Sequence, residues 1–317
     1  MTLFLGHSTA FRILRSLDRA SLLNTSQAVP RSQVIPTLAK KNTLHPALAG
    51  KPLPFDVIVP DEKTRSQSKR LRNHIWKLPE RAGCFLALEK GLYLAGPELC
   101  FIQMGKECSE LELAKIGFEL CGTYRIDRSQ DVGFRNAEPL TNPTSIEKLI
   151  EAMPGKVPQQ TSRALCFVRD GSASPMETCL ALMFGLPPRM GGYGLGMPEM
   201  NAEVSISAKH ARQVTHCAYH CDLFWPECRV AVEYNSREFH LNETAIERDA
   251  SRVNNLQAAG ISTLAITRAH VANPEKLDAV AHSLARMMGK RIRTNYADIS
   301  QRRANLRKQL FAKDRWN

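Results

Sequence analysis

Two acidic residues stand within a stretch that is otherwise typical of a buried β-hairpin. Residues 221–240, CDLFWPECRVAVEYNSREFH, place Asp222 and Glu233 among leucine, phenylalanine, tryptophan, valine and alanine. With residues 226–228 as the turn, antiparallel pairing brings position 222 opposite positions 231 to 233. Because side chains alternate between the two faces of a strand, Glu233 and Asn235 share one face. A buried carboxylate is costly unless something pairs with it, so the hairpin predicts a partner for its acids.

A divalent cation is one partner that resolves the conflict between the two acids. Carboxylates within about 4–6 Å of each other raise each other's pKa, and a bound cation removes that repulsion. Hard oxygen ligands favour Mg²⁺ or Mn²⁺ over Zn²⁺. Mg²⁺ commonly joins protein carboxylates to a substrate phosphate, and such a metal activates water for attack on that phosphate. The hairpin therefore indicates hydrolysis of a phosphodiester bond.

Four further residues have types and positions that suit this chemistry. Glu177 lies near the start of a predicted helix that we expect to pack beside the sheet. His240 follows the hairpin and has the chemistry to orient or deprotonate a water. Arg248 and Arg252 are four residues apart on the next predicted helix, so they share a face that can hold a phosphate. The predicted metal ligands are Asp222, Glu233, Glu177 and Asn235.

Three blocks of sequence, in order, resemble a known nuclease family. SPMET (174–178), the hairpin and ERDASRVNNLQAAGISTLAIT (247–267) are similar to PD-(D/E)XK endonuclease-like domains related to very-short-patch repair endonucleases. The resemblance covers about residues 165–270. It implies a metal-dependent DNA endonuclease with a restriction-endonuclease-like mixed sheet flanked by helices. It also implies the catalytic positions, which are Glu177, Asp222, Glu233 and His240.

Two departures from the family pattern give an alternative hypothesis. Where these domains often carry an aspartate after the hairpin glutamate, this chain has Asn235, and the lysine of the family name is absent. Asparagine keeps an oxygen ligand but loses a charge. The alternative is a catalytically weakened nuclease fold that binds DNA or regulates a partner. Residues 91–103, GLYLAGPELCFIQ, resemble regions beside such domains in bacterial antitoxins of the abortive-infection type, which implies a bacterial, defence-related context.

Each candidate residue also has a purely structural interpretation. The hairpin acids are then capping groups for the backbone, or partners of Arg229 or Arg252. A glutamate in the first turn of a helix, such as Glu177, simply favours the helix dipole. His240 is then a surface histidine, and Arg248 belongs to a solvated helix face beside neighbouring acids.

The charge of the chain favours a polyanionic partner, which is DNA in this interpretation. The 317 residues carry a formal net charge of +12, with a pI near 9.4. From Lys290 onward there are nine Lys or Arg residues and two Asp residues. A basic tail of this kind either attracts nucleic acid or forms a solvated helix face. The predicted nucleic-acid contacts are Arg248, Arg252, Arg291, Arg293, Arg302 and Arg303.

The elements that must position these residues predict an α/β protein. The sequence predicts strands at 55–60 and 261–267 and helices at 109–122 and 244–260. No stretch of about 18 apolar residues predicts a membrane helix. The first residues lack the pattern of a signal peptide, and nine scattered cysteines favour reduced thiols, so we expect a cytoplasmic protein.

Three regions follow from changes in composition along the chain. Residues 1–150 are expected to form a smaller mixed α/β domain. A polar, proline-rich stretch within 127–160 is expected to be a linker that holds one short helix. Residues 160–289 are expected to form the endonuclease-like domain, and residues 290–317 a basic tail.

Overall fold

The chain folds into two units that are described separately. The computed structural model describes residues 3–18, 53–65, 67–75, 84–89, 91–153, 157–205, 218–235, 256–257, 259–294 and 296–312. Unit 1 spans residues 1–168 together with the last four residues, and unit 2 spans residues 169–313. Both are mixed α/β, which confirms the predicted fold class. No helix among the described residues has the length and apolar character needed to cross a membrane.

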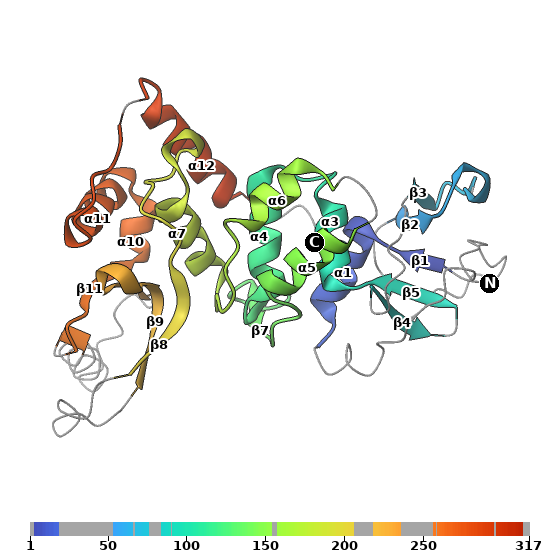
Figure 1. Cartoon of the computed structure of the whole chain (residues 1–317), viewed down its shortest axis with the longest axis horizontal. Coiled ribbons are helices and arrows are strands. Elements are labelled where there is room, and N and C mark those ends of the chain that lie inside the picture. Colours follow the sequence, from blue (N-terminus) through green and yellow to red (C-terminus); the bar gives the residue numbers. More distant parts are fainter. Residues whose placement is uncertain are drawn as a thin grey trace. The chain divides into compact units, whose positions relative to one another are not determined.

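Unit 1 is built on a five-stranded mixed sheet with the order β3-β2-β1-β5-β4 (Figure 1). The central strand β1 pairs antiparallel with β2 and parallel with β5. Every residue of β2 is buried, including Asp56, because helices cover this part of the sheet. The strands are β1 (Leu3–Leu5), β2 (Phe55–Val59), β3 (Leu71–Ile75), β4 (Phe85–Glu89) and β5 (Leu92–Ala95).

The helices of unit 1 pack on the sheet and on one another. Helix α1 contacts α3 and β2, and α4 contacts α3 and α6. Helix α4 begins at a capping box between Ser109 and Glu112 and ends at Gly122, as the sequence predicted. The elements are α1 (His7–Ser16), η3 (Glu62–Thr64), α3 (Pro97–Met104), α4 (Glu110–Cys121), the hairpin of β6 (Tyr124–Ile126) and β7 (Phe134–Asn136), α5 (Pro143–Ala152) and α6 (Gln159–Leu165).

Unit 2 is built on a four-stranded sheet with the order β11-β10-β9-β8 (Figure 1). Strands β9 and β10 form the predicted hairpin, with Trp225 opposite Val230 and the short helix η5 (Pro226–Cys228) as the turn. Strand β11 pairs parallel with β10. The strands are β8 (Glu199–Ser205), β9 (Ala218–Trp225), β10 (Val230–Asn235) and β11 (Ser262–Thr267).

Helices of unit 2 pack beside this sheet. Helix α7 contacts β9, and α10 and α11 contact β11. Helix α12 contacts α7 and η4 and buries Leu306 and Leu310. The elements are α7 (Pro175–Gly185), η4 (Pro188–Met190), α10 (Arg268–Ala272), α11 (Pro274–Met287) and α12 (Ile299–Leu310). Most of the predicted helix at 244–260 lies outside the described residues.

The division between the units differs from the boundaries expected from composition. The stretch expected to be a linker holds β7, the expected short helix as α5, and the start of α6, all within unit 1, and Ile146 of α5 is fully buried. The basic stretch from residue 290 belongs to unit 2 through α12. Asn142 caps α5 and Pro143 occupies its first turn, so these polar and proline residues begin a helix rather than mark a linker.

Candidate functional site

The two acids of the hairpin are neighbours across strands β9 and β10. Leu223 pairs with Val232, so the next pair in the same register is Asp222 and Glu233, on the opposite face of the sheet. The backbone N–H of Tyr234 donates to Asp222 Oδ2 at 2.7 Å. Glu233 is buried and Asp222 is half-buried. The predicted juxtaposition of the two carboxylates is therefore present in the hairpin.

Glu177 reaches this pair from the first turn of α7. Ser174 caps the helix, accepting from the Glu177 backbone N–H at 3.2 Å and donating to Glu177 Oε1 at 2.9 Å. The N–H of Ala173 donates to Oε2 at 2.8 Å. Burial raises the pKa of Glu177, and the nearby charge of Asp222 raises it further, against the lowering effect of these hydrogen bonds. Three acidic side chains from α7, β9 and β10 thus belong to one neighbourhood.

Asn201 of β8 is a fourth polar member that the sequence did not single out. Its side-chain amide donates to Glu177 Oε2 at 2.8 Å and to the carbonyl of Gly171 at 2.9 Å. The register of β8 on β9 places Asn201 opposite Asp222. Its φ of 47° is in the left-handed region, which asparagine tolerates better than most residues. We refer to Glu177, Asn201, Asp222 and Glu233 as the acidic site.

The remaining predicted residues near the hairpin lie at its edge or outside the described residues. Asn235 is exposed at the end of β10, where it pairs in register with Thr267. Arg229, an alternative partner for the acids, donates to the carbonyls of Ala259 and Gly260. His240, Arg248 and Arg252 lie outside the described residues.

Two of the predicted DNA-binding arginines hold helix α12 in place. Arg302 donates to Asp298 and to the carbonyl of Arg189, both at 2.8 Å. Arg303 donates to Asp278 at 3.1 Å and lies over the ring of Tyr193. Arg291 and Arg293 are exposed, as contact with a large anion requires. Their DNA contacts remain a prediction.

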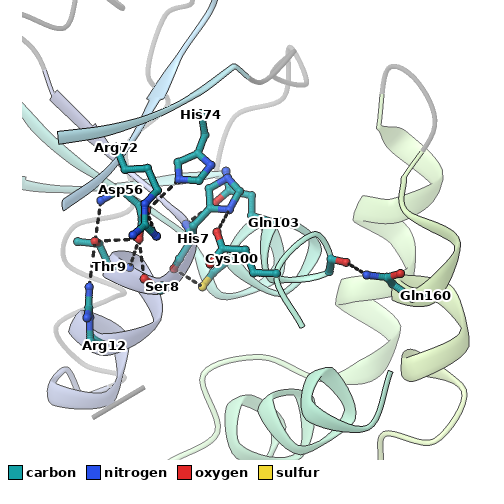
Figure 2. Close-up of polar contacts among 12 residues, drawn as sticks. His7, Ser8, Thr9, Arg12, Asp56, Arg72, His74, Cys100, Gln103 and Gln160 are labelled. Atoms are coloured by element: carbon teal, nitrogen blue, oxygen red, sulfur yellow. Dashed lines mark hydrogen bonds and ion pairs between the residues drawn. The ribbon is translucent and has the colours of Figure 1, made fainter. Parts of the chain in front are cut away.

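A second polar cluster lies in unit 1, where the sequence indicated no chemistry. Figure 2 shows the Asp56 carboxylate between the start of α1 and the side chains of β3. Asp56 Oδ2 accepts from Ser8 Oγ at 2.5 Å and from the Thr9 N–H at 3.2 Å, and Oδ1 accepts from His74 Nε2 at 2.9 Å. Burial alone would raise the pKa of Asp56, but these side-chain hydrogen bonds from His74 and Ser8 lower it to about 2. Asp56 is therefore an anion at the N-terminus of α1.

Two histidines and a glutamate complete this cluster. The ring of His7 stacks on that of His74, with centroids 3.6 Å apart (Figure 2). His7 Nδ1 lies 2.6 Å from Glu107 Oε1. Within the described residues, His7, His74 and Glu107 are the one group of three or more His, Cys, Asp or Glu side chains whose ligand atoms all lie within 4.8 Å of one another. We refer to these three residues and Asp56 as the histidine cluster.

Sequence reasoning missed the histidine cluster because its members come from distant segments. His7 begins α1, Asp56 is in β2, His74 is in β3 and Glu107 follows α3. One local signal was present, since Asp56 interrupts an apolar strand, FDVIV, whose other side chains are all buried. That signal predicts a polar partner for Asp56 but does not identify it.

The comparisons with known proteins gave no match. Neither the protein-family models, nor the curated proteins, nor the solved structures compared with this chain are similar to it.

Proposed function

We propose that unit 2 is a Mg²⁺- or Mn²⁺-dependent endonuclease domain that hydrolyses phosphodiester bonds in DNA. The observation that carries this proposal is the register of the hairpin, which sets Asp222 opposite Glu233, with Glu177 close enough for the charge of Asp222 to raise its pKa. Like charges on neighbouring strands repel each other, and a bound cation removes that repulsion. The donors at the site are oxygens, which suits these two metals.

The elements that these sequence blocks form are compatible with the proposal. Helix α7 with its acid comes first, the acidic hairpin follows, and β11 closes the sheet parallel to β10. This is the order in which the sequence blocks resemble the endonuclease-like domains. The sheet holds the two hairpin acids on adjacent strands, so their spacing is fixed by the backbone rather than by side-chain packing.

Each residue has a defined task in this proposal. Asp222, Glu233 and Glu177 would hold the metal, which supplies an activated water and stabilises charge on the phosphate. The Tyr234 N–H fixes the orientation of Asp222, and Asn201 with Ser174 fixes that of Glu177. His240 positions or deprotonates the attacking water. Exposed basic residues, among them Arg291 and Arg293, attract the phosphate backbone.

A plasmid-nicking assay with a matched pair of variants tests this function. The full chain is incubated with supercoiled DNA in Mg²⁺, in Mn²⁺ and in chelator. Glu233→Gln keeps the shape of the side chain and removes its charge. Glu203→Gln makes the same change at an exposed position of β8 in the same sheet. We expect nicking that needs metal, persists in Glu203→Gln and disappears in Glu233→Gln. Equal nicking by the two variants would exclude the acidic site as its source.

A specific observation favours a second candidate, a nuclease fold that binds DNA or regulates a partner without cutting. Both oxygens of Glu177 already accept hydrogen bonds from within unit 2. Moreover, Glu177, Asp222 and Glu233 are not among the ligand groups that come within 4.8 Å in the described part of the chain. This candidate predicts salt-sensitive DNA binding without nicking, and nicking that appears when Asn235→Asp restores a charge beside the hairpin acids.

A further inference from the structure

The geometry of the histidine cluster points to a second metal site, which goes beyond the proposed nuclease function. We propose that His7, His74 and Glu107 bind a divalent transition metal of the zinc class. Two imidazoles and one carboxylate are a ligand set typical of zinc sites that keep one position open. Zn–N and Zn–O bonds of about 2.0–2.2 Å set ligands on one ion roughly 3.5 Å apart. The ligand atoms of the three side chains all lie within 4.8 Å of one another, so a bound ion would draw them closer and turn the two rings out of their stacked arrangement.

The backbone brings His7 to this position. His7 has a φ of 50°, in the left-handed region, directly after Gly6. A Cβ at Gly6 would lie 2.8 Å from both Gln103 Oε1 and the Ile58 side chain, so any larger residue here would displace these side chains of α3 and β2. The His7 N–H donates to the same Gln103 oxygen at 2.9 Å. The start of α1 is thus held against α3, beside the segment that carries Glu107.

Asp56 orients the second histidine. An ionised carboxylate only accepts hydrogen bonds, so His74 Nε2 must be the donor in its 2.9 Å contact with Asp56. In a neutral imidazole the other nitrogen, Nδ1, then carries the lone pair that a metal needs. In many metal sites, a carboxylate accepts a hydrogen bond from the histidine nitrogen that does not bind the metal, and this orients the ring. Ser8 and Thr9 fix the carboxylate in turn.

The charges around the cluster indicate which metal it selects. Asp56 and Glu107 supply two negative charges, and the guanidinium groups of Arg72 and Arg12 are close enough to influence them. Because two cations offset two anions, net charge does not attract a metal here. Affinity must come from coordination by imidazole nitrogen, which favours Zn²⁺ or Co²⁺ over Mg²⁺. The acidic site of unit 2 has the opposite preference.

Without a metal, the same residues form a polar network. Glu107 contacts His7, whose ring stacks on His74, which donates to Asp56. A polar network of this kind holds β2, β3, α1 and α3 together without binding any ion. The two interpretations differ in one measurable quantity, which is the number of zinc ions that the chain retains.

Metal analysis of the full chain tests the site. Wild type, His74→Ala, Glu107→Gln and His282→Ala are stripped with chelator, dialysed against Zn²⁺ in the presence of excess Mg²⁺, and their zinc content is measured. His282 is exposed on α11 and serves as the matched histidine control. We expect His74→Ala and Glu107→Gln to retain one zinc ion fewer than wild type and His282→Ala. In Co²⁺-loaded protein, visible absorption bands should be lost in the same two variants.

Equal zinc content in wild type and both cluster variants would overturn the proposal. Circular dichroism confirms that each variant is folded, and Glu107→Gln, which keeps the size of the side chain, remains informative if His74→Ala does not fold. DNA nicking by the acidic site does not depend on this result. A chain that cuts DNA but binds no zinc through His74 would therefore refute the second metal site and leave the proposed function intact.

Discussion

A single buried carboxylate, that of Asp56, holds several segments of unit 1 together. Its side chain is fully buried, and it accepts hydrogen bonds from α1 and β3. A carboxylate in such a place is stable only because each of its oxygens has donors. Glu177 is the corresponding residue of unit 2, but there a neighbouring acid adds to the effect of burial and its pKa is raised instead. Two buried carboxylates thus have pKa values shifted in opposite directions in the two units.

The lowered pKa of Asp56 predicts a specific loss of stability in acid. Its pKa is about 2 in the folded chain, against an ordinary value of 3.8 for an aspartate. Asp56 therefore stabilises the fold by roughly 2 kcal/mol above pH 4, and this contribution is lost as the pH falls from about 4 to 2. Across this pH window, we expect wild type to lose roughly 2 kcal/mol more of its free energy of unfolding than Asp56→Asn loses.

Urea unfolding at several pH values, with chelator present, measures this difference. Asp61→Asn, a change at an exposed position of the same unit, is the control and should follow wild type. Parallel pH curves for wild type and Asp56→Asn would show that the buried carboxylate is not the acid-sensitive group.

At the scale of elements, a buried ion pair joins α1 to α4. Arg15 Nε and Nη2 donate to the two oxygens of Glu119 at 2.8 and 2.7 Å, and both side chains are buried. Glu119 also accepts from the N–H of Ile126, so the same carboxylate fixes the end of β6 in the β6–β7 hairpin. The pair therefore joins α1 to α4 and β6, two neighbouring elements that come much later in the sequence.

Breaking this pair should cost far more than replacing it. Arg15→Ala leaves the Glu119 carboxylate buried beside fewer donors, and we expect the free energy of unfolding to fall by about 3–5 kcal/mol. In the double variant Arg15→Met with Glu119→Leu, neither charge of the pair is left buried alone, so part of that loss should be recovered; the buried Arg125 still loses a neighbouring anion, and the Ile126 N–H loses its acceptor. Guanidinium chloride unfolding of the three proteins provides the measurement. A double variant no more stable than Arg15→Ala would contradict the electrostatic explanation.

The elements that the sequence predicted correctly are those whose signals are local. The hairpin of unit 2 follows from alternating apolar residues around Pro226, and α4 follows from its periodicity and from Gly122. The histidine cluster had no such signal, because its members become neighbours only when α1, β2, β3 and α3 pack. The short helix expected at 145–153 is present as α5, whose start at Asn142 and Pro143 is also a local signal.

Within the candidate site, the sequence predicted which acids are neighbours but not which residue holds Glu177 in place. The register that sets Asp222 beside Glu233 depends only on the turn, so it could be predicted. Asn201 could not be, because its contact with Glu177 joins β8 to α7 across 24 positions of sequence. Arg302 and Arg303 were assigned to DNA from charge alone, which cannot distinguish an exposed arginine from one that anchors a helix.

At the scale of the whole molecule, the two units present two kinds of polar site. The acidic site of unit 2 offers oxygen ligands, and the histidine cluster of unit 1 offers imidazole nitrogens as well. The net charge of +12 adds a general attraction for polyanions that is independent of both. The proposed DNA binding through this charge can therefore be tested separately from the chemistry proposed for either site.

The basic stretch of unit 2 gives the last prediction, which concerns DNA binding by the whole chain. Arg291 and Arg293 are exposed, whereas Arg303 is held by Asp278 and Tyr193. Each lost phosphate contact lowers the slope of log affinity against log salt by about 0.9. We expect the double variant Arg291→Gln with Arg293→Gln to lower that slope by roughly 2 in anisotropy titrations between about 50 and 200 mM salt. Arg303→Gln should instead lower the melting temperature and leave the slope unchanged, because its contacts anchor α12. An unchanged slope in the double variant would remove these two arginines from the DNA-binding surface.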